Sequence, residues 1–76
     1  MISEAVVTNK LESLVAAAIE KTPELARRYL RFETQDGHVT LRGSVATYFQ
    51  KQVAQETIRR IDGVAAVSNE LEVVWS

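Results

Sequence analysis

The dipeptide Asp36-Gly37 separates two short segments in which apolar and polar residues alternate. The apolar positions are Leu30 and Phe32 before the dipeptide and Val39 and Leu41 after it. Alternation with a period of two is the pattern of a half-buried strand. Asp-Gly favours the tight two-residue turn of a β-hairpin, because both central positions of that turn need positive φ. The sequence therefore predicts a hairpin with one apolar face, which other elements have to cover.

A helix is predicted before the hairpin, from about Glu4 to Lys21, with Ser3 as its N-cap. It is expected to end at Thr22-Pro23, because the residue before a proline is pushed out of the α region. The residues from Pro23 to Arg28 are expected to form a connector, with room for one helical turn. The apolar side chains at helical spacing that should face the core are Val7, Leu11, Leu14, Val15 and Ala18.

A second helix is predicted after the hairpin. Thr47 and Gln50 have the spacing of a capping box, in which a hydroxyl residue is followed three positions later by Glu or Gln. The helix should run to about Ile61 and stop at Asp62-Gly63, where Gly63 suits a left-handed position at the helix end. Its buried side should consist of Val53, Ala54, Thr57, Ile58 and Ile61.

The last predicted element is a strand from about Val67 to Trp75, with Val67, Leu71 and Val73 on one face. The order α-β-β-α-β predicts an α+β fold, a two-layer sandwich with two helices on one face of a three-stranded mixed sheet. The last strand should run parallel to the second, whereas the order of the strands stays open. A chain of 76 residues is expected to form a single domain, residues 1–76.

Composition excludes several kinds of site. The chain has no cysteine and one histidine, so neither a disulfide nor a structural zinc site is expected. The net charge of -1 does not favour nucleic-acid binding. His38 follows the predicted turn with no evident serine partner, and no acid pair stands at catalytic spacing, so an enzyme, a cofactor and a metal are not expected.

The N-terminal segment lacks the features of a signal peptide. A cytoplasmic location is therefore the default expectation, with a periplasmic or membrane-associated one if the chain is cut from a longer protein. No apolar run is long enough for a membrane span.

Two segments around the second predicted helix carry a family resemblance. Residues 36–45 read DGHVTLRGSV and residues 63–73 read GVAAVSNELEV. They match, in order, the pattern D-G-x-V-x-L-x-G-x-V, a helix, then G-V-x-x-V-x-N-x-L-x-V. In this respect the chain resembles the BON domain, named for bacterial osmotic-shock and nodulation proteins, over nearly its whole length.

The resemblance implies a non-enzymatic binding module of the same fold. BON domains are proposed to contact phospholipid membranes, and they occur in exported stress proteins and attached to channels and secretion proteins. Some act in cytoplasmic proteins, including one that senses potassium together with a second domain. The motif glycines and Asn69 have scaffold roles, so no lipid-binding residue carries over from the family to this sequence.

The candidate lipid-binding residues are four arginines, Arg27, Arg28, Arg31 and Arg42. Arg31 and Arg42 should project from the sheet face opposite the helices, where two guanidinium groups can hold a lipid phosphate by bidentate hydrogen bonds. The alternative is an ordinary solvated face, on which the arginines pair across strands with Glu33, Glu70 and Glu72.

Aromatic side chains supply a second candidate contact. Tyr48, Phe49 and Trp75 can anchor a membrane interface or a protein partner if exposed. The simpler expectation is that they close the ends of a thin core, with Phe49 covering it and Tyr48 pointing away. The partners predicted are a phospholipid surface or, alternatively, a protein, including a second copy bound through an exposed edge strand or the Trp75 end.

Overall fold

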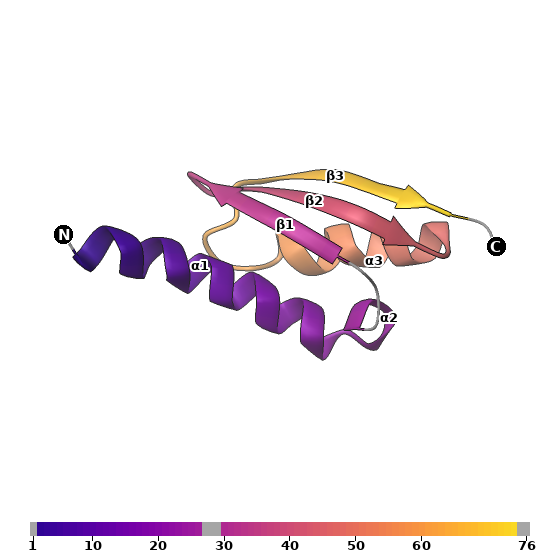
Figure 1. Cartoon of the computed structure of the whole chain (residues 1–76), viewed down its shortest axis with the longest axis horizontal. Coiled ribbons are helices and arrows are strands. Elements are labelled where there is room, and N and C mark those ends of the chain that lie inside the picture. The colour runs from indigo at the N-terminus through magenta and orange to yellow at the C-terminus, as the bar shows by residue number, and fades with distance from the viewer. Residues whose placement is uncertain (1, 27–29, 75–76) are drawn as a thin grey trace.

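The computed structural model describes residues 2–26 and 30–74, with side chains from residue 10 onward. The elements follow the predicted order α-β-β-α-β, and the helical turn of the connector forms a short additional helix (Figure 1). In chain order they are α1 (Ile2–Lys21), α2 (Pro23–Ala26), β1 (Leu30–Gln35), β2 (His38–Val45), α3 (Tyr48–Arg59) and β3 (Ala66–Val73).

The hairpin turn between β1 and β2 has the backbone that the Asp-Gly sequence predicts. Asp36 and Gly37 both have positive φ, 52° and 82°, as a type I′ turn requires. The Gly37 carbonyl also accepts a hydrogen bond of 2.7 Å from the Ala65 backbone N–H. A Cβ atom on Gly37 would lie 3.1 Å from the Gly63 carbonyl oxygen. The turn therefore needs glycine for its φ and for its close packing against the segment that leads into β3.

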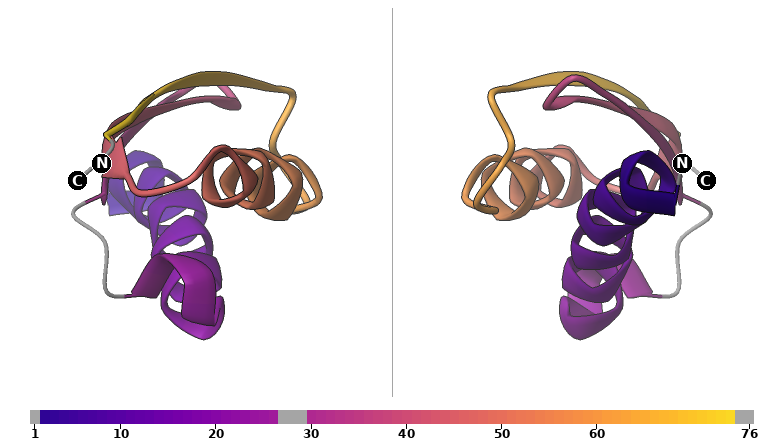
Figure 2. Two further views of the ribbon diagram at one scale, coloured as in Figure 1. Left: turned by 90° about the vertical axis from the view of Figure 1, so that its right-hand side faces the viewer. Right: turned by 90° about the vertical axis from the view of Figure 1, so that its left-hand side faces the viewer.

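The sheet has the order β1-β2-β3. β1 and β2 are antiparallel, and β2 and β3 are parallel, as the α3 crossover between them predicts. Figure 2 shows that the helices lie on one side of the curved sheet and that its other side carries no helix. The predicted two-layer α+β sandwich is therefore confirmed. We call the uncovered side of the sheet the open face.

The capping box predicted for α3 is present. The Thr47 side chain accepts from the Gln50 backbone N–H, and the Gln50 side chain accepts from the Thr47 backbone N–H. The helix ends at Arg59, earlier than predicted, because the Ile61 N–H turns back to the Ile58 carbonyl in a tighter final turn. Gly63 has positive φ as expected, but it lies in the following turn and not at the helix cap.

The core lies between the sheet and the helices. Its buried side chains come from all the strands except β1 and from all three helices; they are Val15, Leu25, Val39, Leu41, Val45, Ala54, Ile58 and Leu71. Phe32 and Leu30 of β1 pack against this cluster while remaining partly exposed. The predicted inward positions of β2, α3 and β3 thus form one continuous apolar layer.

Three details of the sequence prediction were wrong. The helix α1 begins at Ile2, so Ser3 lies inside its first turn and not at the N-cap position before it. Leu14 is 42% exposed, because it lies on the flank of the apolar stripe whose centre, Val15, is fully buried. β3 ends at Val73, and Trp75 lies outside the described residues.

Candidate functional site

The open face of the sheet is polar. Side chains alternate along each strand, so the neighbours of the buried Val39 and Leu41 project away from the helices. The charged residues on this face are Arg31 and Glu33 of β1, His38 and Arg42 of β2, and Glu70 and Glu72 of β3. With His38 neutral, the carboxylates on the face outnumber the guanidinium groups.

Two of the predicted arginines meet on this face. Arg31 and Arg42 are direct cross-strand partners, and both are exposed. Arg42 is held by two carboxylates: Nη1 lies 3.2 Å from Glu33 Oε1, and Nε lies 3.2 Å from Glu70 Oε1. The cross-strand pairing expected as the alternative to a lipid site is therefore present around Arg42. Arg27 and Arg28 lie outside the described residues.

His38 has a partner that the sequence did not reveal. Its Nε2 lies 2.6 Å from the Ser68 hydroxyl oxygen, on the neighbouring strand. The two residues are 30 positions apart, and only the register of β2 with β3 brings them together. Within residues 10–26 and 30–74 no carboxylate hydrogen-bonds to His38, so the pair lacks the orienting group of a catalytic triad.

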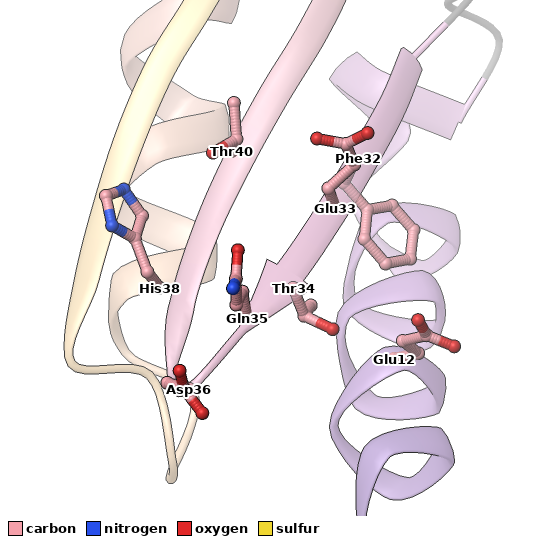
Figure 3. Close-up of a pocket in the computed structure, with 8 residues that line it drawn as sticks. All are labelled: Glu12, Phe32, Glu33, Thr34, Gln35, Asp36, His38 and Thr40. Atoms are coloured by element: carbon pink, nitrogen blue, oxygen red, sulfur yellow. The ribbon is translucent and has the colours of Figure 1, made fainter. Parts of the chain in front are cut away.

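A shallow depression of about 830 Å³ spans the open face and the edge of β1 (Figure 3). The residues that line it are Glu12, Phe32, Glu33, Thr34, Gln35, Asp36, His38 and Thr40. In Figure 3 the Phe32 ring lies beside α1, whereas His38 projects from β2 near β3. Among the described residues no group of three or more His, Cys, Asp or Glu is arranged to hold a metal ion.

One end of the molecule presents apolar side chains. Tyr48 and Phe49 are 63% and 62% exposed in the first turn of α3. Val74, which is 48% exposed, lies at the same end, because its backbone N–H donates to the Val45 carbonyl just before that turn. Figure 1 places the start of α3 and the end of β3 together, opposite the start of α1. We call Tyr48, Phe49 and Val74 the aromatic end.

The expectation that Phe49 covers the core was wrong. The core-facing side of α3 is occupied by Ala54 and Ile58, five and nine residues after Phe49, spacings that place them on a different side of the helix from Phe49. Phe49 instead stands beside Gln52 and Val53 on an exposed side of the helix. Tyr48 and Phe49 are therefore both exposed, which is the condition that the alternative expectation, an aromatic contact surface, requires.

Hydrogen bonds hold the backbone next to the aromatic end. Gln50 Oε1 accepts from the backbone N–H groups of Ala46, at 2.7 Å, and Thr47, at 3.3 Å. Thr47 Oγ1 accepts from the Gln50 N–H at 3.1 Å. The first turn of α3 contains no acidic residue. These bonds fix the direction in which Tyr48 and Phe49 project from the helix.

Within the described residues the arrangement contains no assembled nucleophile, base and charge-stabilising group. No helix in the described part of the chain is both long and apolar enough to cross a membrane.

Comparison with known proteins gives one finding. The family model described as "BON domain" matches residues 8–74. No curated protein matches the sequence.

Proposed function

Because the chain belongs to the BON domain family, a family of non-enzymatic binding domains, we propose that it is a binding module that contacts a phospholipid surface through the aromatic end. The observation that carries the proposal is the exposure of two neighbouring aromatic side chains, Tyr48 and Phe49, each by more than 60%. In this role the chain would itself sit at a membrane or support a membrane-associated or stress-associated protein.

Tyrosine and phenylalanine suit the interface of a bilayer. Aromatic side chains are enriched at the level of the lipid headgroups, where the ring is apolar and the tyrosine hydroxyl remains hydrated. Fully burying one large apolar side chain contributes roughly 1.5–3 kcal/mol. Since both rings already protrude, the contact needs no rearrangement of the core.

The basic residues play a smaller part in this proposal. Arg42 already has two carboxylate partners, at 3.2 Å each, and it would have to exchange them for a lipid phosphate. Arg31 has no ion pair among the described residues and is the more accessible cation of the open face. Arg27, Arg28 and Trp75 stay candidate contacts, to be tested by substitution.

The test is flotation of the purified chain with phospholipid vesicles. We expect the parent chain to float and the double variant Tyr48→Ser/Phe49→Ser to lose most of its bound fraction. Leu14→Ser is the matched control, because it removes an exposed apolar side chain of α1 and leaves the aromatic end intact. Circular dichroism should show that all three chains are folded. A parent chain that fails to float on any vesicle would refute the proposal.

A protein-interaction or regulatory module is the second candidate. The strand order leaves the outer edge of β3 unpaired within the described chain, and unpaired edges can accept a further strand. If a second copy binds there, the elution volume and melting temperature should depend on protein concentration. A cation-sensing role would instead give a melting-temperature increase with potassium that sodium does not reproduce.

A further inference from the structure

We infer that the aromatic end inserts into the lipid headgroup region while the open face stays in water, so that binding requires no anionic lipid. This inference rests on the proposed phospholipid function and specifies its lipid class: zwitterionic phospholipid is sufficient. It follows from three features of the structure, namely the charge on the open face, the hydrogen bonding of the aromatic end and the position of that end on the molecule.

The open face is a poor surface for an anionic membrane. Its central cation, Arg42, is paired with Glu33 and Glu70. Glu72 adds a further exposed carboxylate next to Glu70 along β3. A face with three carboxylates and two guanidinium groups has no net positive charge to attract anionic lipid. A lipid phosphate placed beside Arg31 would also approach these carboxylates.

The backbone next to the aromatic end, in contrast, is partly hydrogen-bonded within the protein. A backbone N–H that leaves water without a hydrogen-bond partner carries a large free-energy penalty. Here the N–H groups of Ala46 and Thr47 are bonded to the Gln50 side chain, that of Gln50 to the Thr47 side chain, and that of Val74 to the Val45 carbonyl. The N–H groups of Tyr48 and Phe49, at the first two helical positions, have no intrahelical partner and need water or a lipid headgroup oxygen as acceptor. No acidic side chain stands in the first turn of α3. Insertion of the aromatic end into lipid therefore buries no carboxylate of that turn.

The position of the aromatic end sets the orientation. The molecule is elongated, with extents of 46 × 19 × 18 Å. The start of α3 lies near one tip of the long axis, beside the ends of β2 and β3 (Figure 1). With the tip in the headgroups, the hairpin turn at Asp36-Gly37, at the other end of the sheet, points away from the bilayer.

The first test compares vesicles of phosphatidylcholine alone with vesicles that also contain phosphatidylglycerol, each at low and high salt. We expect the partition coefficients for the two vesicle types to agree within about threefold. This is less than the roughly fivefold increase in binding that a single basic residue near an anionic surface would contribute. Arg31→Glu should likewise change binding by less than about threefold, by the same comparison. Tyr48→Ser/Phe49→Ser should lower it about tenfold or more, given the apolar area removed.

The second test measures the orientation of the protein on the bilayer. Since the chain has no cysteine, a single introduced cysteine can carry an environment-sensitive fluorophore. A label at Gln52→Cys, beside Phe49, should shift to the blue on phosphatidylcholine vesicles. A label at Gln35→Cys, next to the hairpin turn, should not shift.

The outcomes separate this inference from the function on which it rests. Absence of binding to both vesicle types refutes the phospholipid function itself. Binding only to vesicles with phosphatidylglycerol, lost at high salt and in Arg31→Glu but retained in Tyr48→Ser/Phe49→Ser, leaves the lipid function standing and overturns the inference. A blue shift of the Gln35→Cys label also overturns it, because the open face would then lie on the bilayer.

Discussion

The side chain of Asn69 connects β3 to α3. Its Nδ2 donates to the Lys51 carbonyl at 2.8 Å and to Gln55 Oε1 at 3.3 Å. Its Oδ1 accepts from the Leu71 backbone N–H at 3.2 Å. The Asn69 amide therefore satisfies the Leu71 N–H of β3 and ties α3 to this strand. Hydrogen bonding to the backbone is the role expected of Asn69 from the sequence.

Asn69→Ala should lower the free energy of unfolding by about 1–3 kcal/mol, because it removes hydrogen bonds at a partly buried site. Urea denaturation followed by circular dichroism measures the loss. Gln55→Ala is the control, because it removes only the longest of the three contacts, and its effect should be clearly smaller. Equal losses for the two variants would contradict the role given to Asn69.

Gly43 has a φ of 127°, in a region that residues with a Cβ atom rarely adopt. It lies within β2, opposite Leu30 of β1 and Leu71 of β3, so the backbone there is held on both sides. Gly43→Ala should therefore cost about 1–3 kcal/mol of stability through backbone strain. The adjacent substitution Ser44→Ala should change stability by less than about 0.5 kcal/mol. Thermal or urea unfolding of both variants checks this contrast.

At the scale of elements, α3 is the part of the molecule that its own local sequence defines best. The capping box at Thr47 and Gln50 fixes its start, and a tight turn at Ile58–Ile61 ends it. The same cap holds the aromatic end, so the residues that begin α3 lie directly beside the proposed contact surface. Strand β3 has no such local definition, since its position depends on β2 and on α3.

Thr47→Ala and Gln50→Ala should each destabilise the protein by about 0.5–2 kcal/mol, because each removes one half of the capping box. In a chain of this size a loss of 1 kcal/mol lowers Tm by roughly 4–8 °C. The two effects should be non-additive, because either substitution disrupts the reciprocal pair. Thr47→Asn, which keeps a capping oxygen, is the control. Additive losses in the double variant would show that the two bonds act independently.

At the scale of the whole molecule, stability depends on one thin layer of apolar side chains. The buried core residues lie between three strands and the helices, and the buried set in the described chain contains no polar or charged residue. A chain of 76 residues is expected to have about 4–11 kcal/mol of stability. Single core side chains therefore account for a large part of the total.

Leu41→Ala should remove about 2–5 kcal/mol, because Leu41 is 1% exposed at the centre of the middle strand and leaves a cavity. A loss at the upper end of this range would leave a protein of about 4–5 kcal/mol stability substantially unfolded. Ile58→Val, on the facing helix, should cost only about 0.5–1.5 kcal/mol. Denaturant midpoints of the two variants measure the difference. Similar, small losses would mean that the core can collapse around the missing side chain.

The sequence by itself determined most of the elements and the inward and outward faces of the strands. The turn at Asp36-Gly37, the capping box at Thr47 and the stop at Pro23 all act within a few residues, so their signals can be recognised without knowing the rest of the fold. The BON pattern around the second helix consists of the same local signals, and it identified the family that the match over residues 8–74 shows.

Only the tertiary structure decided which surfaces these elements present. The strand order and register bring His38 to Ser68 over 30 positions, a contact that no local sequence pattern predicted. They also decide that it is Arg42 that pairs with both Glu33 and Glu70, out of the cross-strand pairs that the sequence left open. The exposure of Phe49 and Leu14 depends on the rotation of each helix about its own axis relative to the sheet. That rotation is set by the neighbouring side chains that pack into the core. The candidate site, unlike the elements that carry it, is thus a product of packing between distant segments.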